Sequence, residues 1–306
     1  MKQILRRIRP FARLPRPLRW LARSLVTAVV IVLAATGLVT YQVRASFPQV
    51  DGELRAPGLH GGVTVARDQY GIPQIYADDP HDLFLAQGYV HAQDRFWEMD
   101  FRRHITAGRL SEMFGAATLA QDKAVRTMGW RRVAEQELPL LDQRTRDYLQ
   151  DYARGVNDWL DQHPGRAEKS LEYAVLGLTN ADYVPEPWTP ADSLAWLKAM
   201  AWDLRSNLGD ELARASAATT MPKSRVDALW PDYPYDKHEP IVTSGAVRNG
   251  VFDQAAPVTS AAQPASFAQA LSSPSVVRRA HQALDAVPDA LGRADSGLGS
   301  NSWVVS

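Results

Sequence analysis

The most constraining feature of this 306-residue chain is a long apolar segment close to its amino terminus. No charged residue occurs from Ser24 to Gln42. A membrane-spanning helix needs roughly 20 apolar residues, whereas the core of a cleavable signal needs about 7 to 15. The length favours an anchor, although the small residues Val43 and Ala45 also fit a signal-cleavage site. Seven arginines precede the segment: Arg6, Arg7, Arg9, Arg13, Arg16, Arg19 and Arg23. They keep the amino end in the cytoplasm and predict a periplasmic or other extracytoplasmic location for the rest.

Charge and composition narrow the classes of partner. The first 50 residues hold nine Lys or Arg and no acidic residue, so the remainder carries 25 basic and 34 acidic residues, a net charge of −9. This balance argues against a nucleic-acid partner, which would require a basic surface. The chain has no cysteine, which excludes disulfides, thiolate metal sites and cysteine nucleophiles. The seven histidines include no pair at helical spacing, so a helical zinc site is not expected.

The apolar periodicity predicts one hairpin followed by three long helices. Alternation over residues 63–68 and 72–76 indicates a strand pair. Helices are expected at 79–108 and 142–160, and a third is expected to run from Thr189 past residue 204, with Leu194, Leu197, Ala201 and Leu204 buried. Within the first helix, Asp94 and Arg95 are interpreted as a structural ion pair rather than as a catalytic acid and its partner. A shorter helix is expected within 276–291.

Near the end of the sequence, Ser300 follows Gly299, three residues before an apolar strand start at Trp303. Glycine allows strained backbone angles, so the serine hydroxyl can reach the carbonyl carbon of Gly299 and form an ester that water opens. The new α-amino group, with a reference pKa of about 8, can serve as general base for its own hydroxyl. On these residues alone, a Gly-Ser-Asn loop turn is the commoner explanation.

Several motifs in order resemble the precursors of the penicillin acylase family. The resemblance covers roughly residues 63–240 and 299–306. The matching segments are Val65–Ala77, Gly88–Met99, Arg102–Arg103, Gly108–Glu112, Gly155–Asn157, Trp188–Glu211 and Gly299–Trp303.

The resemblance implies an N-terminal-nucleophile (Ntn) hydrolase of the α+β class, in which an α segment, an excised spacer and a β segment form an αββα sandwich. The chain then divides into a basic region with a signal or transmembrane helix (1–45), an acylase α segment (46–240), a spacer (241–299) and the start of a β segment (300–306). It is mainly the helical α segment and lacks most of the β segment. The mature form is expected to be an α/β heterodimer.

The same resemblance assigns roles to particular residues. Ser300 matches the nucleophile, and the peptide bond between Gly299 and Ser300 matches the autocleavage site. Met200 and Leu204 match positions that border the acyl pocket, and Leu204 replaces an aromatic residue of the penicillin G type. Glu211 matches a ligand of structural calcium, with Asp210 as its alternative. No organic cofactor is expected.

The implied activity is hydrolysis of a small N-acyl amide through an acyl-enzyme. Penicillins, cephalosporin side chains and acyl-homoserine lactones all remain open as substrates. A truncated, inactive, membrane-tethered binding or envelope protein is the alternative, because the sequence ends at Ser306 within an expected strand. For the 306-residue piece alone we predict no catalysis, because the family's oxyanion-hole donors lie further along the β segment.

Overall fold

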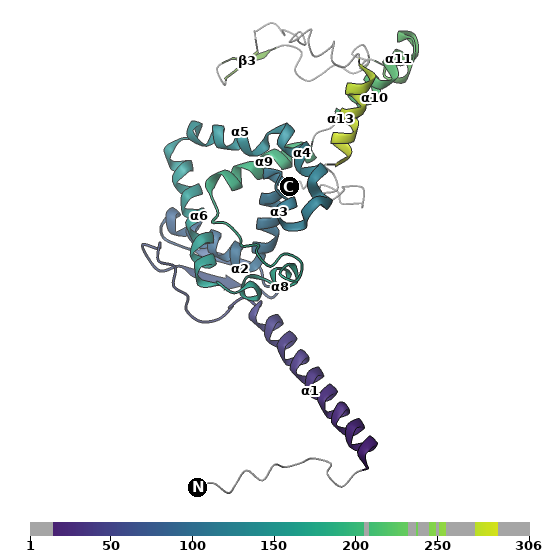
Figure 1. The fold of residues 1–306 in the computed structure, drawn as a ribbon. Helices are drawn as coiled ribbons and strands as arrows, with labels where there is room; N and C mark the ends of the chain where they lie inside the picture. The colour runs from purple at the N-terminus through teal and green to yellow at the C-terminus, as the bar shows by residue number, and fades with distance from the viewer. Residues whose placement is uncertain are drawn as a thin grey trace. The chain divides into compact units, whose positions relative to one another are not determined.

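The structure is a computed structural model that describes residues 15–204, 208–231, 237, 245–248, 251–254 and 273–286. Helices dominate this part of the chain, and its four short strands form two antiparallel hairpins (Figure 1). The mainly helical character predicted for the α segment is therefore confirmed. The α-helices are α1 (Arg16–Ala45), α2 (Pro80–Ala107), α3 (Ser111–Phe114), α4 (Leu119–Met128), α5 (Trp130–Glu137), α6 (Gln143–Gln162), α7 (Arg166–Lys169), α8 (Leu171–Leu176), α9 (Pro190–Asp203), α10 (Leu208–Ala218), α11 (Lys223–Leu229) and α13 (Pro274–Ala286).

The remaining elements are short. The 3-10 helices are η1 (Gly115–Thr118) and η2 (Leu138–Leu140), and the strands are β1 (Thr64–Arg67), β2 (Pro73–Tyr76), β3 (Ala246–Arg248) and β4 (Val251–Asp253). The described residues divide into two compact units. One unit contains the residues up to His104, Glu112–Phe114 and Arg131–Leu194, and the other contains Ile105–Ser111, Gly115–Trp130 and the residues from Ala195 onwards.

The predicted hairpin is confirmed. Strand β1 pairs antiparallel with β2, with Thr64 opposite Tyr76. The turn between them is held by Asp68, whose Oδ1 accepts hydrogen bonds from the backbone N–H groups of Tyr70 (2.8 Å) and Ile72 (2.9 Å). Gly71 has φ +79°, a left-handed conformation that favours glycine. The local sequence therefore specifies this turn without help from the rest of the fold.

Helix α2 is the central element of the first unit, and its limits match the prediction. At its start, the Asp79 side chain accepts the N–H of His81 at 3.0 Å, which satisfies one donor of the first turn. At its end, Gly108 has φ +62°. The helix is not continuous, because Arg95 has non-helical angles (φ −145°, ψ 23°).

Helices α2 and α6 pack with their backbones in close approach. A Cβ atom on Gly155 of α6 would lie 1.9 Å from the carbonyl oxygen of Leu85, and one on Gly88 of α2 would lie 2.1 Å from that of Tyr152. Each glycine thus admits the backbone of the other helix. Asp142 caps α6 by accepting the Thr145 N–H at 3.0 Å, which confirms the predicted start of this helix.

An aromatic core fills the space around this helix pair. Phe96 packs against Trp159 and Tyr173, with ring centroids 5.5 and 6.1 Å away. All of its members belong to the first unit: Tyr89, Ala92, Phe96, Met113, Ala153, Val156, Trp159, Tyr173, Leu176 and Trp188. Aromatic side chains bury large areas, so this cluster supplies much of the hydrophobic stabilisation of the unit.

The prediction of the third helix is correct for its start but wrong for its end and for most of its buried residues. It begins as expected, because Asp192 accepts the Thr189 N–H at 2.7 Å. It ends at Asp203, and a separate helix, α10, begins at Leu208. Leu194 is buried as predicted, whereas Leu197, Ala201 and Leu204 are exposed. An apolar stripe identifies the face of a helix that prefers burial, but it does not determine whether the described residues cover that face.

The second unit has its own small core. Trp130 packs against Trp202 with ring centroids 5.9 Å apart, and α13 contacts both α4 and α10. Val277 of α13 and Leu212 of α10 are buried there. The shorter helix expected within 276–291 is confirmed as α13, although it begins and ends earlier than predicted.

Candidate functional site

The predicted nucleophile and cleavage bond, Ser300 and Gly299, lie outside the described residues. The predicted acyl-pocket residues, Met200 and Leu204, are described and lie one turn apart in the same region of the chain. The Leu204 N–H donates to the Met200 carbonyl at 3.0 Å, and the side chains are 46% and 75% exposed. Together with the exposed Leu197, they form an apolar stripe on α9 and the residue that follows it. The structure thus brings the two together without enclosing them in a pocket.

Glu211, the predicted calcium ligand, lies in the first turn of α10 rather than in the third predicted helix. It borders a cavity of about 350 Å³ between α10 and α11. The lining residues are Glu211, Arg214, Ala215, Ala218, Met221, Lys223, Val226 and Asp227. The second carboxylate of this cavity, Asp227, is bound by Lys223 at 2.5 Å. Calcium takes six to eight oxygen ligands, so the described residues around Glu211 do not complete a calcium site.

Asp94 does form a structural ion pair, but the predicted partner is wrong. Both of its carboxylate oxygens accept from the Arg67 guanidinium, at 2.8 and 2.9 Å, which ties strand β1 to α2. Arg95 instead pairs with Glu98 at 3.3 Å on the exposed side of the helix. Asp94 and Arg95 therefore each pair with another residue, and the pair that the sequence suggested is not formed.

The most elaborate polar constellation is centred on Asp100, which is fully buried in α2. One carboxylate oxygen accepts from the Arg103 guanidinium, and the other accepts from the hydroxyls of Tyr173 (2.7 Å) and Tyr183 (2.6 Å). Burial opposes ionisation of Asp100, but the hydrogen bond from His104 and the charge of Arg103 together hold its pKa well below the usual range. Burial, reinforced by the nearby Asp100 charge, raises the pKa of Tyr173.

The constellation links α2 to a distant segment of the first unit. Arg103 donates to the carbonyls of Glu186 (2.9 Å) and Pro187 (3.1 Å), and its guanidinium lies 5.5 Å from the centre of the Trp188 ring. Each oxygen of the Asp100 carboxylate accepts a hydrogen bond from a buried or half-buried side chain of the protein. This arrangement is suited to holding the fold together and not to chemistry. Asp100 was not among the residues predicted from the sequence.

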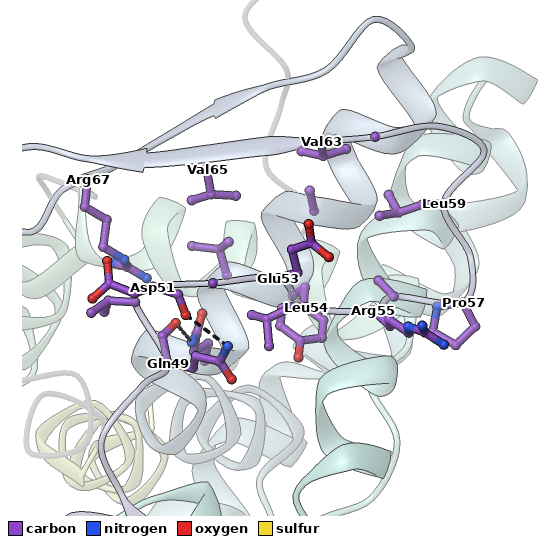
Figure 2. Close-up of a pocket in the computed structure, with 18 of the residues that line it drawn as sticks. Gln49, Asp51, Glu53, Leu54, Arg55, Pro57, Leu59, Val63, Val65 and Arg67 are labelled. Carbon is purple, nitrogen blue, oxygen red and sulfur yellow. Dashed lines mark hydrogen bonds between the residues drawn. The ribbon is translucent and has the colours of Figure 1, made fainter.

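A cavity of about 770 Å³ lies in the first unit. Figure 2 shows Val63 and Val65 on one side of it and Glu53 and Leu54 on the other. Residues of α2 also line it, and one of them, Gln93, donates to the Gln49 carbonyl at 2.6 Å. The lining includes no serine, threonine, cysteine, lysine or histidine. Its lining carries the acidic side chains of Asp51 and Glu53 and the Tyr89 hydroxyl, but none of the Ser, Thr, Cys or Lys nucleophiles of covalent catalysis.

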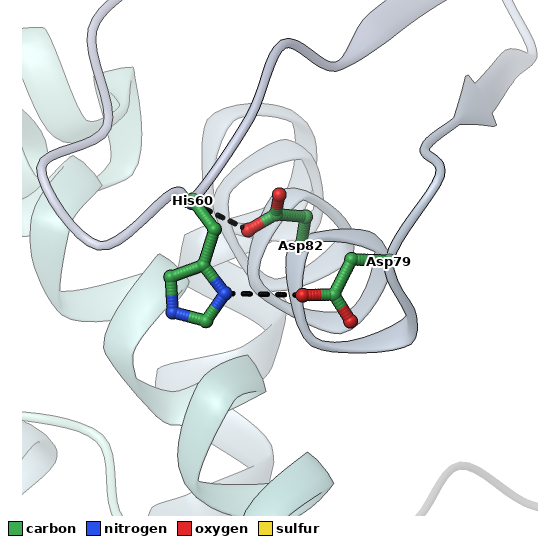
Figure 3. A group of neighbouring side chains, drawn as sticks. All are labelled: His60, Asp79 and Asp82. Carbon is green, nitrogen blue, oxygen red and sulfur yellow. Dashed lines mark hydrogen bonds and ion pairs between the residues drawn. The ribbon is translucent and has the colours of Figure 1, made fainter.

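A second constellation missed by the sequence analysis joins a loop residue to the start of α2. His60 Nδ1 lies 3.0 Å from a carboxylate oxygen of Asp79, and Asp82 completes a group with the composition of a metal site (Figure 3). The Asp82 carboxylate, however, already accepts the N–H groups of His60 (2.8 Å) and Gly61 (2.9 Å). Its oxygens hold the loop, so these residues form a structural cluster. The hydrogen bonds from His60 and from the His81 N–H lower the pKa of Asp79.

Next to this cluster, the ring of His81 is hydrogen-bonded to Asp151 of α6. Asp151 also lies 3.3 Å from the Arg154 guanidinium. The hydrogen bond to Asp151 raises the pKa of His81, and burial opposes this shift only in part. The pair crosses from α2 to α6, so it connects the protonation of a histidine to the packing of the two helices.

Comparison with known proteins identifies the class to which this chain belongs. A sequence model of the family described as penicillin amidase matches residues 62–306. The chain therefore belongs to the penicillin amidase family. The matched range includes both hairpins, every described helix from α2 to α13 and the segment with Gly299 and Ser300, and it begins after α1.

Particular relatives are penicillin acylases and acyl-homoserine lactone acylases. The chain is 36% identical to the penicillin acylase 2 proenzyme of Pseudomonas sp. (strain SE83) over 157 residues, which are 51% of this chain and 19% of that protein. It is 30% identical to the acyl-homoserine lactone acylase QuiP of Pseudomonas fluorescens (strain Pf0-1) over 218 residues, 71% of this chain and 26% of that protein. The chain thus spans about a fifth to a quarter of the length of these relatives.

Among solved structures, the chain is similar to a thermostable penicillin G acylase from Alcaligenes faecalis. The sequence identity is 27%, and the match covers 66% of this chain and 98% of that chain, with a TM-score of 0.47.

Proposed function

We propose that this chain is the front part of a precursor of an N-acyl amidohydrolase, with Ser300 as the nucleophile. The observation that carries the proposal is the match to the penicillin amidase family over residues 62–306, which includes the Gly299–Ser300 bond. The named relatives, a penicillin acylase and an acyl-homoserine lactone acylase, support the same class of reaction.

Maturation proceeds by attack of the Ser300 hydroxyl on the carbonyl carbon of Gly299. The C–N bond breaks, an ester forms, and the nitrogen of Ser300 takes up the proton as a free amine. Water then hydrolyses the ester, which leaves a carboxylate on Gly299 and a new amino terminus on Ser300. Glycine at the first position favours this step, because it tolerates the backbone strain that brings hydroxyl and carbonyl together.

In the mature enzyme the same hydroxyl attacks the amide carbonyl of the substrate. The α-amino group of Ser300, with a reference pKa of about 8, accepts the hydroxyl proton and passes it to the leaving amine. Water then hydrolyses the acyl-enzyme and releases the carboxylic acid. The substrate class is a small N-acyl amide, of the penicillin, cephalosporin or acyl-homoserine lactone type.

Met200 and Leu204 are proposed to border the acyl group of this substrate. Their exposed, adjacent apolar side chains support the proposal, because an apolar acyl chain would remove them from water. A leucine at 204 favours flexible aliphatic chains over arylacetyl groups. Replacement Leu204→Phe in the mature enzyme is expected to shift kcat/KM towards arylacetyl amides, and an unchanged acyl preference would exclude Leu204 from the pocket.

Calcium is proposed as a structural ion held by Glu211, with further oxygen ligands from residues outside the described ones. Bound calcium would tie α10 to the rest of the protein and have no part in proton transfer. Equilibrium dialysis of the complete protein measures this directly. Glu211→Gln is expected to lose one bound calcium ion that Asp210→Asn retains, and equal binding by both variants would remove Glu211 from the site.

The proposed location follows from α1. Among the described residues, α1 is the one helix long and apolar enough to cross a membrane, with a mean hydropathy of 2.1 over its apolar window. We propose that it acts as a signal or anchor and places the catalytic part in the periplasm, as an α/β heterodimer processed from one precursor.

The proposed activity is tested by a substrate panel on the protein expressed from its complete reading frame. Release of free amine from N-acyl amides is expected for the wild type and is expected to be lost in Ser300→Ala. Ser302→Ala serves as the matched control, because it changes a nearby hydroxyl outside the cleavage bond. A native rate in Ser300→Ala would refute the proposal.

A further inference from the structure

Helix α8 is apolar on two opposite sides. Its buried side carries Tyr173 and Leu176, which belong to the aromatic core of the first unit. Leu171 and Val175 face the other way, and Leu178 continues the same stripe just past the end of the helix; Val175 and Leu178 are 59% and 85% exposed. Exposed apolar side chains that gather on one face often mark a contact with a membrane or another protein. The exposed stripe of α8, defined as Leu171, Val175 and Leu178, therefore calls for a second apolar neighbour.

The position of α8 in the first unit indicates what that neighbour is. Helices α7 and α8 contact α1, and Figure 1 shows α8 beside the end of α1 that joins the rest of this unit. Every side chain of α1 from Arg23 to Tyr41 is exposed, whereas Gln42, Val43 and Ala45 are half-buried. The contact is therefore made by the last turn of α1.

This contact fixes the depth of α8 relative to a membrane that α1 crosses. The charge-free run ends at Gln42 and the helix ends at Ala45, so the two points are about 5 Å apart at 1.5 Å per residue. Elements that contact the last turn of α1 then lie at the boundary between acyl chains and headgroups. Tyr41, an aromatic type enriched at this boundary, is exposed at the same end of α1.

We infer that the exposed stripe of α8 inserts into the headgroup–acyl boundary of the phospholipid bilayer, so that the first unit lies against the membrane surface. The inference rests on the proposed role of α1 as a retained anchor. Four charged residues of α7 and α8 balance: Arg166, Glu168, Lys169 and Glu172. Lys169 is already bound to the Pro164 carbonyl at 2.8 Å. Insertion is therefore apolar and does not require anionic lipid.

The absence of cysteine from the chain allows a direct test. A nitroxide spin label is attached to single cysteines in the full chain, reconstituted in phosphatidylcholine nanodiscs. Val175→Cys reports the stripe of α8, and Leu33→Cys reports the middle of α1. Leu140→Cys is the matched control: Leu140 is 81% exposed and precedes α6, a 20-residue helix about 30 Å long that separates it from α7.

Collision rates with oxygen, which concentrates in lipid, and with a water-soluble nickel chelate give each position a depth. The labels at residues 33 and 175 are expected to collide more often with oxygen than with the nickel chelate. The label at residue 140 is expected to collide more often with the nickel chelate. Protection at 175 is expected to persist at high salt, and its loss there would contradict an apolar contact. If 175 behaves like 140 while 33 is protected, the inference is overturned and the anchor stands. If the label at residue 33 also collides freely with the nickel chelate, α1 does not span the bilayer, and both the proposed anchor and the membrane contact of α8 are wrong.

Discussion

At the scale of single residues, the described structure uses its buried charges to join distant parts of the chain. The Asp100 carboxylate accepts hydrogen bonds from Arg103 in its own helix and from Tyr173 and Tyr183, which lie more than 70 residues further along the chain. Asp122 does the same locally in the second unit, where it accepts the N–H groups of Leu110 and Ser111, both at 2.8 Å. In each case the carboxylate replaces water with fixed donors, which is the condition for burying a charge.

Asp100→Asn is expected to destabilise the protein by about 3–5 kcal/mol, because it leaves Arg103 as a buried charge without its partner. The measurement is the midpoint of urea unfolding. Glu98→Gln, which removes the exposed pair with Arg95, is the control and is expected to change stability by no more than about 0.5 kcal/mol. Equal effects of the two substitutions would show that the buried constellation contributes no special stability.

His81 gives a pH dependence whose sign is fixed by its environment. Its pKa is raised in the folded protein by Asp151, so its contribution is fully present below the unfolded pKa of about 6.5 and is lost as pH rises through the folded value. The Tm difference between wild type and His81→Asn is expected to be larger at about pH 6 than at about pH 9. Asp151→Asn should abolish the same pH dependence. A Tm difference that is constant with pH would exclude the coupling.

At the scale of elements, local signals were sufficient where a helix or turn is specified by its own residues. Gln69, Tyr70 and Gly71 predict the hairpin turn, and Asp79 and Asp142 predict the starts of α2 and α6. The partner of Asp94 was not predictable, because Arg67 lies 27 residues earlier and comes near only through the tertiary fold. Ser300 and Gly299, the core of the predicted site, lie outside the described residues and stay predictions.

The structure differs from the sequence prediction at two further points, the end of α9 and the role of Asp100. The apolar pattern of α9 continues through Leu204, but the helix ends at Asp203, since periodicity does not specify where a helix stops. Asp100 was overlooked because a single acidic residue in a helix usually lies on its solvated face. The spacing of Asp100, Arg103 and His104 at three and four residues was the available signal of a side-chain network.

The contact between α2 and α6 gives the clearest prediction at this scale. Gly155→Ala is expected to cost about 3 kcal/mol, the upper end of the usual cost of overpacking, because the new Cβ would lie 1.9 Å from the Leu85 carbonyl oxygen of α2. This exceeds the gain in helix propensity of about 1 kcal/mol. Gly209→Ala in α10 is the control, since its Cβ meets no atom within 4 Å, and it is expected to be neutral or slightly stabilising. A gain in thermal stability for Gly155→Ala would contradict the close approach.

At the scale of the whole molecule, the chain combines a helical segment of the penicillin amidase family with a helix that is long and apolar enough to cross a membrane. The buried constellations found in the described residues are structural, so the proposed chemistry depends on Ser300. The helical part would then serve to hold the acyl pocket and the membrane position, while maturation creates the catalytic group.

Amino-terminal sequencing with intact mass, on the protein purified from its complete reading frame, tests the central proposal most directly. The account predicts one polypeptide that begins Ser300, Asn301, Ser302, Trp303, and it predicts that Ser300→Ala leaves the chain uncut. A single uncut wild-type chain that still hydrolyses N-acyl amides, or a cut at another residue, would contradict the proposed nucleophile.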